Sequence, residues 1–260
     1  MFAGIRRHGR LVFFAAASTA AGFHFSRTSA DAAVVPMTRE EVEECLGSIE
    51  CATALRNGSE DFQSTSKIQF NEGSKWECVV DNKPSLTLWR RSCFGTSYCY
   101  LSHSTHDIPL DEYFDFMMDL EGRANWDSST VSARTVAGSN DSIVYHWEVQ
   151  SPWPFSNRDY VCTRTFQKNV DATRTHVALS AASAHPECPE RDQKGIVRVT
   201  RYRSCMALRE VHANRCESFL LVVDDQKMNV PNSVLSWVAS SAIPRFMKQM
   251  DVQCKRGRSQ

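Results

Sequence analysis

Helical and extended hydrophobic patterns follow one another in a fixed order along this chain. Apolar positions first recur at helical spacing over 38–55, where Thr38 and Glu41 form the signature of a capping box. A polar stretch rich in Gly, Ser and Asn follows over 56–75 and is typical of a linker. The sequence therefore predicts an amphipathic helix over 38–55 and a linker after it.

Apolar runs of strand length come next. Three of them, WECVV, SLTLWRR and FGTSYCYL, are separated by turn residues and predict consecutive antiparallel strands. A second, short helix is predicted in DEYFDFMMDLEGR, because acidic residues crowd its start and Tyr113, Phe116 and Leu120 share an apolar face. Six further strand-like runs are again separated by turn residues. They are IVYHWEV, DYVCTRTF, THVALSA, GIVRVTRY, CMALREV and CESFLLVV.

The last segment, over 231–253, returns to helical spacing. Pro231 is tolerated in a first turn, whereas Pro244 is expected to kink this long C-terminal helix. A strongly curved antiparallel sheet with the long helix across its open mouth is one architecture that satisfies this order. The predicted fold class is therefore α+β.

Composition narrows the function classes. Hydrophobic residues make up 42% of the 260 residues and charged residues 23%, which is the profile of a soluble globular protein with one large core. Lys and Arg number 30, as do Asp and Glu, so no overall field attracts polyanions. A nucleic-acid partner is not expected.

The ten cysteines are scattered singly and form no CxxC pair. Reduced structural thiols are the favoured interpretation, and some disulfides remain an alternative. Cys99, His103 and His106 come nearest to a zinc pattern, but they lack a fourth ligand nearby and are interpreted as a chance cluster. No metal or cofactor is predicted.

Common catalytic motifs are missing from the chain. It contains no GxSxG, GxGxxG, GxxxxGK(S/T) or HExxH sequence. His146 and Glu148 match HxE, but the PCxxC partner of zinc deaminases is absent, and strand alternation explains their spacing. The protein is therefore not expected to be an enzyme.

Residues 1–30 have the composition of a targeting segment. The apolar run over 11–25 would make about 22 Å of helix, short of the roughly 30 Å of a bilayer core. No acidic residue precedes Asp31, and the basic residues are Arg6, Arg7, Arg10 and Arg27. A mitochondrial transit peptide is the favoured interpretation, with a secretory signal, an uncleaved anchor or a cytoplasmic location as alternatives.

Four ordered blocks resemble the START family of lipid-transfer domains. They are WEVQSPWPFSNRDYV, GRANWD, GIVRVTRY and VPNSVLSWVASSAIPRFMKQM, and the resemblance covers 38–255. It implies a helix-grip fold, in which a curved antiparallel sheet wraps around a long C-terminal helix and encloses one lipid-sized cavity. It also implies a monomeric, non-enzymatic carrier that exchanges lipid at membrane surfaces. A carrier of sterol or sphingolipid, or a helix-grip enzyme for a hydrophobic substrate, are the alternatives.

The resemblance also implies a head-group site. In phosphatidylcholine-binding members of the family, an Arg and three aromatic residues surround the head group, and they correspond here to Arg123, Trp147, Tyr160 and Tyr202. Their chemistry fits phosphocholine, because a quaternary ammonium binds aromatic faces and a phosphate suits a guanidinium fork. Phosphatidylcholine is therefore the expected ligand.

Two further residues belong to this predicted site. Asp127 follows Arg123 by four residues, a spacing that allows either a buried ion pair that orients the guanidinium or an ordinary surface pair. Ser204 stands two residues after Tyr202, where the phosphatidylcholine-binding relatives carry a longer amide. Its shorter hydroxyl would admit water or a different head group.

The C-terminal end is basic and partly apolar, although the whole chain has no net charge. One interpretation is a core helix followed by a basic tail over 256–260. The other is docking to an anionic membrane, since each basic residue near such a surface contributes about 1 kcal/mol. The predicted docking residues are Arg245, Phe246, Lys248, Lys255 and Arg256.

Overall fold

The computed structural model describes most of the chain after the predicted targeting segment. Segments 1–30 and 231–237, both interpreted from the sequence, lie outside the described residues, as does the end of the basic tail. The described residues are 36–59, 62, 68–94, 97–139, 141–151, 155–190, 195–225 and 238–257.

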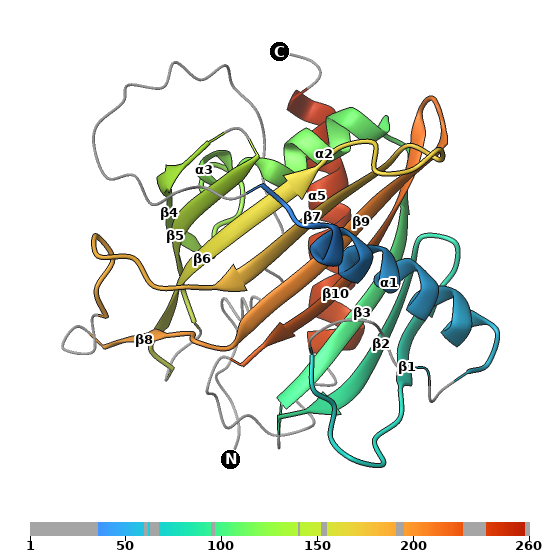
Figure 1. Cartoon of the computed structure of the whole chain (residues 1–260), viewed down its shortest axis with the longest axis horizontal. Coiled ribbons are helices and arrows are strands. Elements are labelled where there is room, and N and C mark those ends of the chain that lie inside the picture. Colours follow the sequence, from blue (N-terminus) through green and yellow to red (C-terminus); the bar gives the residue numbers. More distant parts are fainter. Residues whose placement is uncertain are drawn as a thin grey trace, which may run out of the picture.

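Within these residues one ten-stranded sheet dominates the fold (Figure 1). Its order is β1-β2-β3-β10-β9-β7-β6-β5-β4, all antiparallel, and β8 pairs in parallel with β6. The strands are β1 (Glu77–Asn82), β2 (Leu86–Cys93), β3 (Ser97–His106), β4 (Thr130–Gly138), β5 (Ser142–Val149), β6 (Asn157–Gln167), β7 (Thr175–Ala182), β8 (Ile196–Arg198), β9 (Tyr202–His212) and β10 (Arg215–Asp224).

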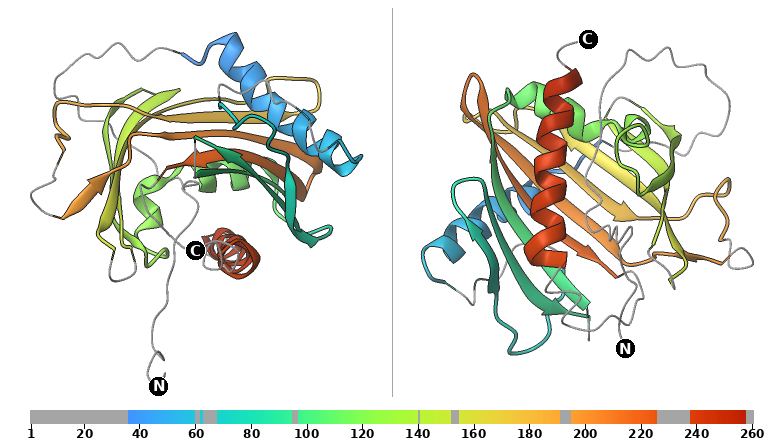
Figure 2. Two further views of the ribbon diagram at one scale, coloured as in Figure 1. Left: turned by 90° about the horizontal axis from the view of Figure 1, so that it is seen from below. Right: turned by 180° about the vertical axis from the view of Figure 1, so that it is seen from behind.

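The helices lie on opposite faces of this curved sheet. Figure 2 shows α1 (Arg39–Arg56) on the convex face and the C-terminal helix α5 (Ile243–Gly257) across the concave face. The short helices α2 (Leu110–Met118) and α3 (Leu120–Arg123) also lie on the concave side. The predicted arrangement of a sheet that curves around a C-terminal helix is thereby confirmed.

Strand alternation divides the buried residues into two cores. On β9 and β10, Met206 and Val222 belong to the core under α5, whereas Ala207 and Leu221 belong to the core under α1. Successive side chains of a strand point to opposite faces, so the central strands must be apolar at nearly every position to serve both cores. This explains the continuous apolar run SFLLVV.

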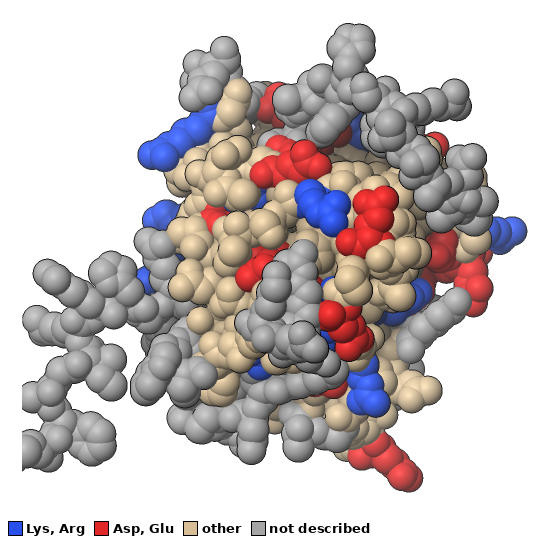
Figure 3. Space-filling view, turned by 90° about the vertical axis from the view of Figure 1, so that its left-hand side faces the viewer, with Lys and Arg blue, Asp and Glu red and all other residues tan. Residues whose placement is uncertain are grey.

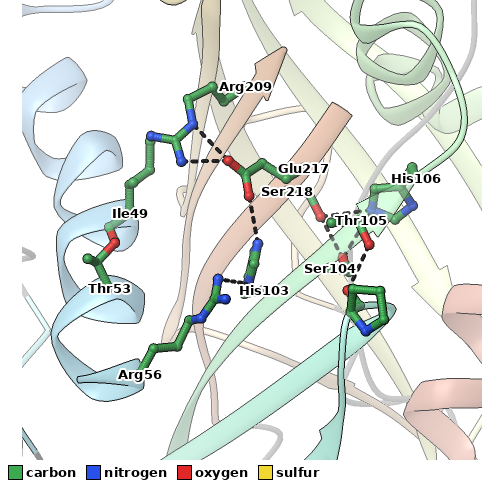
Figure 4. Close-up of polar contacts among 11 residues, drawn as sticks. Ile49, Thr53, Arg56, His103, Ser104, Thr105, His106, Arg209, Glu217 and Ser218 are labelled. Atoms are coloured by element: carbon green, nitrogen blue, oxygen red, sulfur yellow. Dashed lines mark hydrogen bonds and ion pairs between the residues drawn. The ribbon is translucent and has the colours of Figure 1, made fainter. Parts of the chain in front are cut away.

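Helix α1 is confirmed at its predicted position. The Thr38 hydroxyl accepts a hydrogen bond from the Glu41 amide at 3.3 Å, and the Thr38 amide donates to Glu41 Oε2 at 2.8 Å, which completes the capping box. Polar contacts also hold α1 to the sheet (Figure 4). Arg56 Nη1 lies 3.3 Å from His103 Nδ1, and His103 Nε2 lies 2.8 Å from Glu217 on β10.

The predicted second helix is divided into α2 and α3. Asp119 separates them because its backbone is extended, with φ −82° and ψ 93°. Its side chain accepts a hydrogen bond from the Gly122 amide at 2.7 Å and so caps α3. The break allows α3 to turn away from α2 and to end at Arg123.

Two strands differ from the sequence-based expectation. Strand β4 was not predicted, because it has no apolar run. It is an edge strand in which Val131 is 50% exposed. GIVRVTRY does not form one strand, because β8 pairs with Asn157–Asp159 of β6 and the chain then crosses to start β9. This position on β6 is open to β8 because β7 pairs with β6 only from Cys162 onward.

The C-terminal helix changes its hydrogen-bond pattern near Pro244. A π-helix, η2 (Val238–Ala242), runs directly into α5, so Pro244 occupies the first turn of α5 rather than a kink inside one long helix. Proline has no N–H to donate, and a first helical turn tolerates this. No helix in the described part of the chain has both the length and the apolar run needed to cross a bilayer.

Candidate functional site

Arg123, the last residue of α3, is fully buried beneath the sheet. Its Nε donates to Asp127 Oδ2 at 2.8 Å, so the structure brings this predicted pair together as a buried ion pair. The turn between them is helical, since the Asp127 amide donates to the Arg123 carbonyl at 2.8 Å. Asp127 also accepts hydrogen bonds from the amide and hydroxyl of Ser129.

The ionisation of Asp127 follows from these contacts. Burial alone would raise the pKa of its carboxyl group, but Arg123 and the Ser129 hydrogen bonds outweigh burial and hold the pKa below its usual value. Asp127 is therefore ionised at neutral pH. A carboxylate in this position fixes the Arg123 side chain and compensates part of its charge.

Aromatic rings surround the Arg123 guanidinium. Its Cζ lies 4.9 Å from the ring centroid of Trp147, 5.0 Å from that of Phe246 and 5.7 Å from that of Trp126. Trp126 and Phe246 also stack on each other with centroids 5.8 Å apart. Phe246, predicted to dock on membranes, thus lies on the inner side of α5 in this conformation.

The three predicted cage residues form a continuous row of rings. Trp147 on β5 is the register partner of Tyr160 on β6, and their centroids are 5.0 Å apart. The Tyr160 ring meets Tyr202 on β9 at 5.5 Å and 76°. This contact crosses the place where β7, which lies between β6 and β9, has already ended at Ala182. All three rings are buried.

Ser204 lies beside this row on the concave face. It is buried, and it faces Ser180 of β7 across the strand register. A side-chain hydrogen bond links it to Tyr202. Burial raises the pKa of Tyr202 well above its usual value, so this phenol is neutral at physiological pH.

Sequence reasoning missed several polar groups of the site. The Trp147 Nε1–H donates to Thr130 Oγ1 at 3.2 Å, and the Tyr160 hydroxyl donates to both carboxylate oxygens of Asp224 at 3.0 and 3.1 Å. Asp224 follows Val222 by two residues, so strand alternation places it on the same face, but alternation does not show that it meets Tyr160. No sequence pattern indicated that Thr130 belongs to the site, since β4, which it begins, was not predicted.

Arg164 was also missed, although it alternates with Tyr160 along β6. It is buried, its Nε donates to Ser180 Oγ at 2.9 Å, and its Cζ lies 4.9 Å from the Tyr145 ring centroid. Within the described residues its Nη1 has no hydrogen-bond partner. The concave face therefore carries a second buried cation, which lies next to Ser180 of β7 and Tyr145 of β5.

The nearest zinc pattern in the sequence is dispersed by the fold. Cys99 and His103 face the α1 core, whereas His106 faces the other side and contacts Asp251 of α5 at 2.7 Å. Among the described residues no group of His, Cys, Asp or Glu converges as a metal site requires. All ten cysteines are free thiols, and burial raises the pKa of several, such as Cys162, to about 12.

The sequence model of the START domain family matches residues 68–259. The chain belongs to the START domain family. Phosphatidylcholine transfer protein of Bos taurus is 29% identical over 186 residues, which cover 70% of this chain and 85% of that protein. StAR-related lipid transfer protein 7, mitochondrial, of Mus musculus is 31% identical over 235 residues, covering 82% of this chain and 62% of that protein.

Solved structures agree with this START fold. Human STARD10 aligns with a TM-score of 0.60 and 20% identity, covering 70% of this chain and 73% of that one. Human StAR-related lipid transfer protein 5 aligns with a TM-score of 0.56 and 15% identity, covering 83% and 95%. These likenesses confirm the predicted α+β helix-grip fold.

Proposed function

We propose that this START domain is a monomeric, non-enzymatic carrier that binds one phospholipid, preferably phosphatidylcholine, and exchanges it between membranes. The observation that carries the proposal is the unbroken row formed by Arg123, Trp147, Tyr160 and Tyr202 on the concave face. The guanidinium suits the phosphate of phosphocholine, and the rings suit its quaternary ammonium, which has no N–H with which to donate a hydrogen bond. The relative named phosphatidylcholine transfer protein supports the same ligand.

The energetics of extraction support a role for these residues in lipid selectivity. Burying roughly 30 acyl methylenes is favourable by on the order of 25 kcal/mol relative to water, but the bilayer offers nearly the same. Transfer from membrane to protein is therefore close to an exchange. Head-group contacts, at about 2 kcal/mol for a desolvated cation–π contact, then decide which lipid is carried.

The aromatic cluster beside Arg123 favours a phospholipid over a sterol. A sterol hydroxyl carries neither the anion that a buried guanidinium binds nor the cation that the rings bind. Native mass spectrometry of the purified full chain tests the proposal most directly, and phosphatidylcholine is the expected bound lipid. Recovery without lipid, or with sterol alone, would overturn it.

Substitutions in the row should separate the two halves of the head group. Replacing Trp147, Tyr160 or Tyr202 with Ala is expected to weaken phosphatidylcholine binding about 30-fold and phosphatidic acid binding much less, because only phosphatidylcholine has the ammonium. Arg123→Ala should weaken binding of both lipids. The affinities for the two lipids are measured by extraction from vesicles, and the ratio of phosphatidylcholine to phosphatidic acid affinity is compared with that of the wild type. Equal losses of both lipids in the aromatic variants would contradict the cage assignment and leave the carrier proposal standing.

The basic end of α5 is proposed to hold the carrier on anionic membranes while α5 moves from the concave face. Arg245, Lys248, Lys255 and Arg256 are all exposed. Each contributes about 1 kcal/mol within a Debye length of an anionic surface. Phe246 would join the contact only when α5 moves, since its ring now lies against Trp126.

Neutralising these four basic residues tests the docking proposal. Their joint replacement with Gln is expected to reduce co-sedimentation with phosphatidylserine-containing vesicles by about tenfold or more at low salt. A control variant makes the same charge change elsewhere on the described surface, at Arg39, Lys75, Lys83 and Arg201, all exposed. Unchanged binding of the α5 variant would assign docking to other parts of the surface. Figure 3 shows one face on which acidic and basic side chains are interspersed.

We further propose that residues 1–30 direct the protein to mitochondria. The Arg-rich, acid-free composition of that segment supports this, as does the similarity to StAR-related lipid transfer protein 7, mitochondrial, of Mus musculus. A fluorescent protein fused behind residues 1–35 provides the test. Its appearance in the secretory pathway would contradict the proposal.

A further inference from the structure

A carboxylate lies at one end of the row of rings. Asp224 is the last residue of β10, and the Tyr160 hydroxyl donates to its two oxygens at 3.0 and 3.1 Å. In the β9–β10 register Asp224 is paired with Tyr202. Asp224 therefore stands beside both tyrosines of the proposed cage, on the face that Val222 shares.

The hydrogen bond to Asp224 determines what Tyr160 can offer a ligand. Burial, and after it the charge of Asp224, raises the pKa of Tyr160 well above its usual value, so the phenol keeps its proton. That proton is directed to the carboxylate, so the hydroxyl group has only its oxygen lone pairs left to offer. Tyr160 in this state favours a cation and offers no hydrogen-bond donor to a phosphate.

The site as a whole has a positive and a negative end. Arg123 lies against Trp147 at 4.9 Å, Trp147 stacks on Tyr160 at 5.0 Å, and Tyr160 donates to Asp224. A charge of opposite sign lies near each end: Asp127 pairs with Arg123, and Arg158, which shares the face of Tyr160 on β6, interacts with Asp224. Removing the charge of Asp224 therefore changes the charge balance at its end of the row by one unit.

We propose that Asp224 is a specificity-determining residue that selects zwitterionic phospholipids with a cationic amine against anionic phospholipids. Its carboxylate attracts the ammonium while Arg123 holds the phosphate. Each charge of the head group therefore lies next to a residue of opposite charge. An anionic lipid brings no ammonium to the Asp224 carboxylate, so the repulsion between the two negative charges is not offset by an attraction within the head group, and repulsion in a desolvated site is costly. This inference rests on the proposed phospholipid-carrier function and adds to it the negative end of the site.

The variant Asp224→Asn removes the charge and keeps an acceptor for Tyr160. The ratio of the affinities for phosphatidylcholine and phosphatidic acid is expected to fall by about tenfold, the scale of one charge interaction in a partly screened interior. Asp225→Asn is the matched control, because Asp225 lies one residue further along, where it accepts from Ser97 Oγ at 3.2 Å. The control should leave the ratio within about twofold. An unchanged ratio in Asp224→Asn would show that Asp224 serves only to hold Tyr160 and Arg158.

A second comparison covers the case in which Asp224→Asn does not fold. Tyr160→Phe with Asp224→Leu removes both partners of the buried hydrogen bond, which is often nearly neutral for stability. Compared with Tyr160→Phe alone, the double variant should again lose about tenfold in the lipid ratio. An equal ratio in the two would overturn the role of Asp224. Wild-type protein that binds neither lipid would instead overturn the carrier function itself.

Discussion

Replacing Arg123 with Ala is expected to lower the free energy of unfolding by about 3–5 kcal/mol at pH 7, a large part of the stability of a typical domain. The reason is the buried carboxylate that the variant leaves behind. Asp127 loses its guanidinium partner in this variant, and among the described residues Ser129 and Thr130 are the donors that remain. Urea unfolding followed by circular dichroism measures the loss.

The pH dependence of this penalty identifies its cause. In the wild type the pKa of Asp127 is depressed, so the pair contributes stability above the unfolded pKa of about 3.9 and loses it as the pH falls through the folded value. In Arg123→Ala burial raises that pKa, and protonation relieves the penalty as the pH falls from 7 toward 4. A penalty of equal size at both pH values would mean that lost packing, not the unpaired charge, dominates. Arg39→Ala, at an exposed position, should change stability by less than about 0.5 kcal/mol.

The sequence was sufficient for the parts of the fold that rest on periodicity. Helix α1 begins within one residue of its predicted start because Thr38 and Glu41 carry the capping chemistry locally. The central strands were recognisable because they are buried on both faces. Strand β4 was not, since it lies at the sheet edge and its Val131 is exposed. The break at Asp119 was missed, although aspartate is a favoured capping residue and Asp119 caps α3 locally.

The candidate site, like the fold, was predictable only in part from the sequence. The predicted residues Arg123, Trp147, Tyr160 and Tyr202 come from four separate elements, and only the family resemblance indicated that they would meet. Asp224 belongs with them because of a cross-sheet contact to Tyr160, which lies 64 residues away in the chain. Long-range contacts of this kind arise from strand order, and strand order cannot be read from the periodicity of one strand.

The two faces of β6 carry the proposed lipid site on one side and a cluster of structural ion pairs on the other. Tyr160 faces the concave side, whereas its neighbour Asp159 is 1% exposed and accepts hydrogen bonds from Arg198 at 2.9 and 2.7 Å. His146 of β5 also lies 3.1 Å from Asp159. The aspartate of the NRDY motif thus joins β5, β6 and β8, and it holds the strand that presents Tyr160.

This arrangement predicts a second large effect, for Asp159→Asn. Burial alone would raise the pKa of Asp159, but hydrogen bonds from His146 and Arg198 outweigh burial and lower it to about 2. Because the folded pKa is depressed, the carboxylate contributes about 2.5 kcal/mol above pH 4, and this is lost between about pH 4 and 2. The free energy of unfolding of Asp159→Asn should be about 3–5 kcal/mol lower than that of the wild type at pH 7, since Arg198 remains buried without its carboxylate partner.

Denaturant unfolding of both proteins between pH 2 and 7 tests this role of Asp159. The difference in unfolding free energy should narrow as the pH falls, because the wild type loses its carboxylate charge and the variant has none to lose. Asp115→Asn, at a half-exposed surface pair, serves as the control. Curves that stay parallel over this range would contradict the ion-pair account. Because Asp159 faces away from the rings, the folded variant should keep the wild-type ratio of phosphatidylcholine to phosphatidic acid affinity, which Asp224→Asn should not.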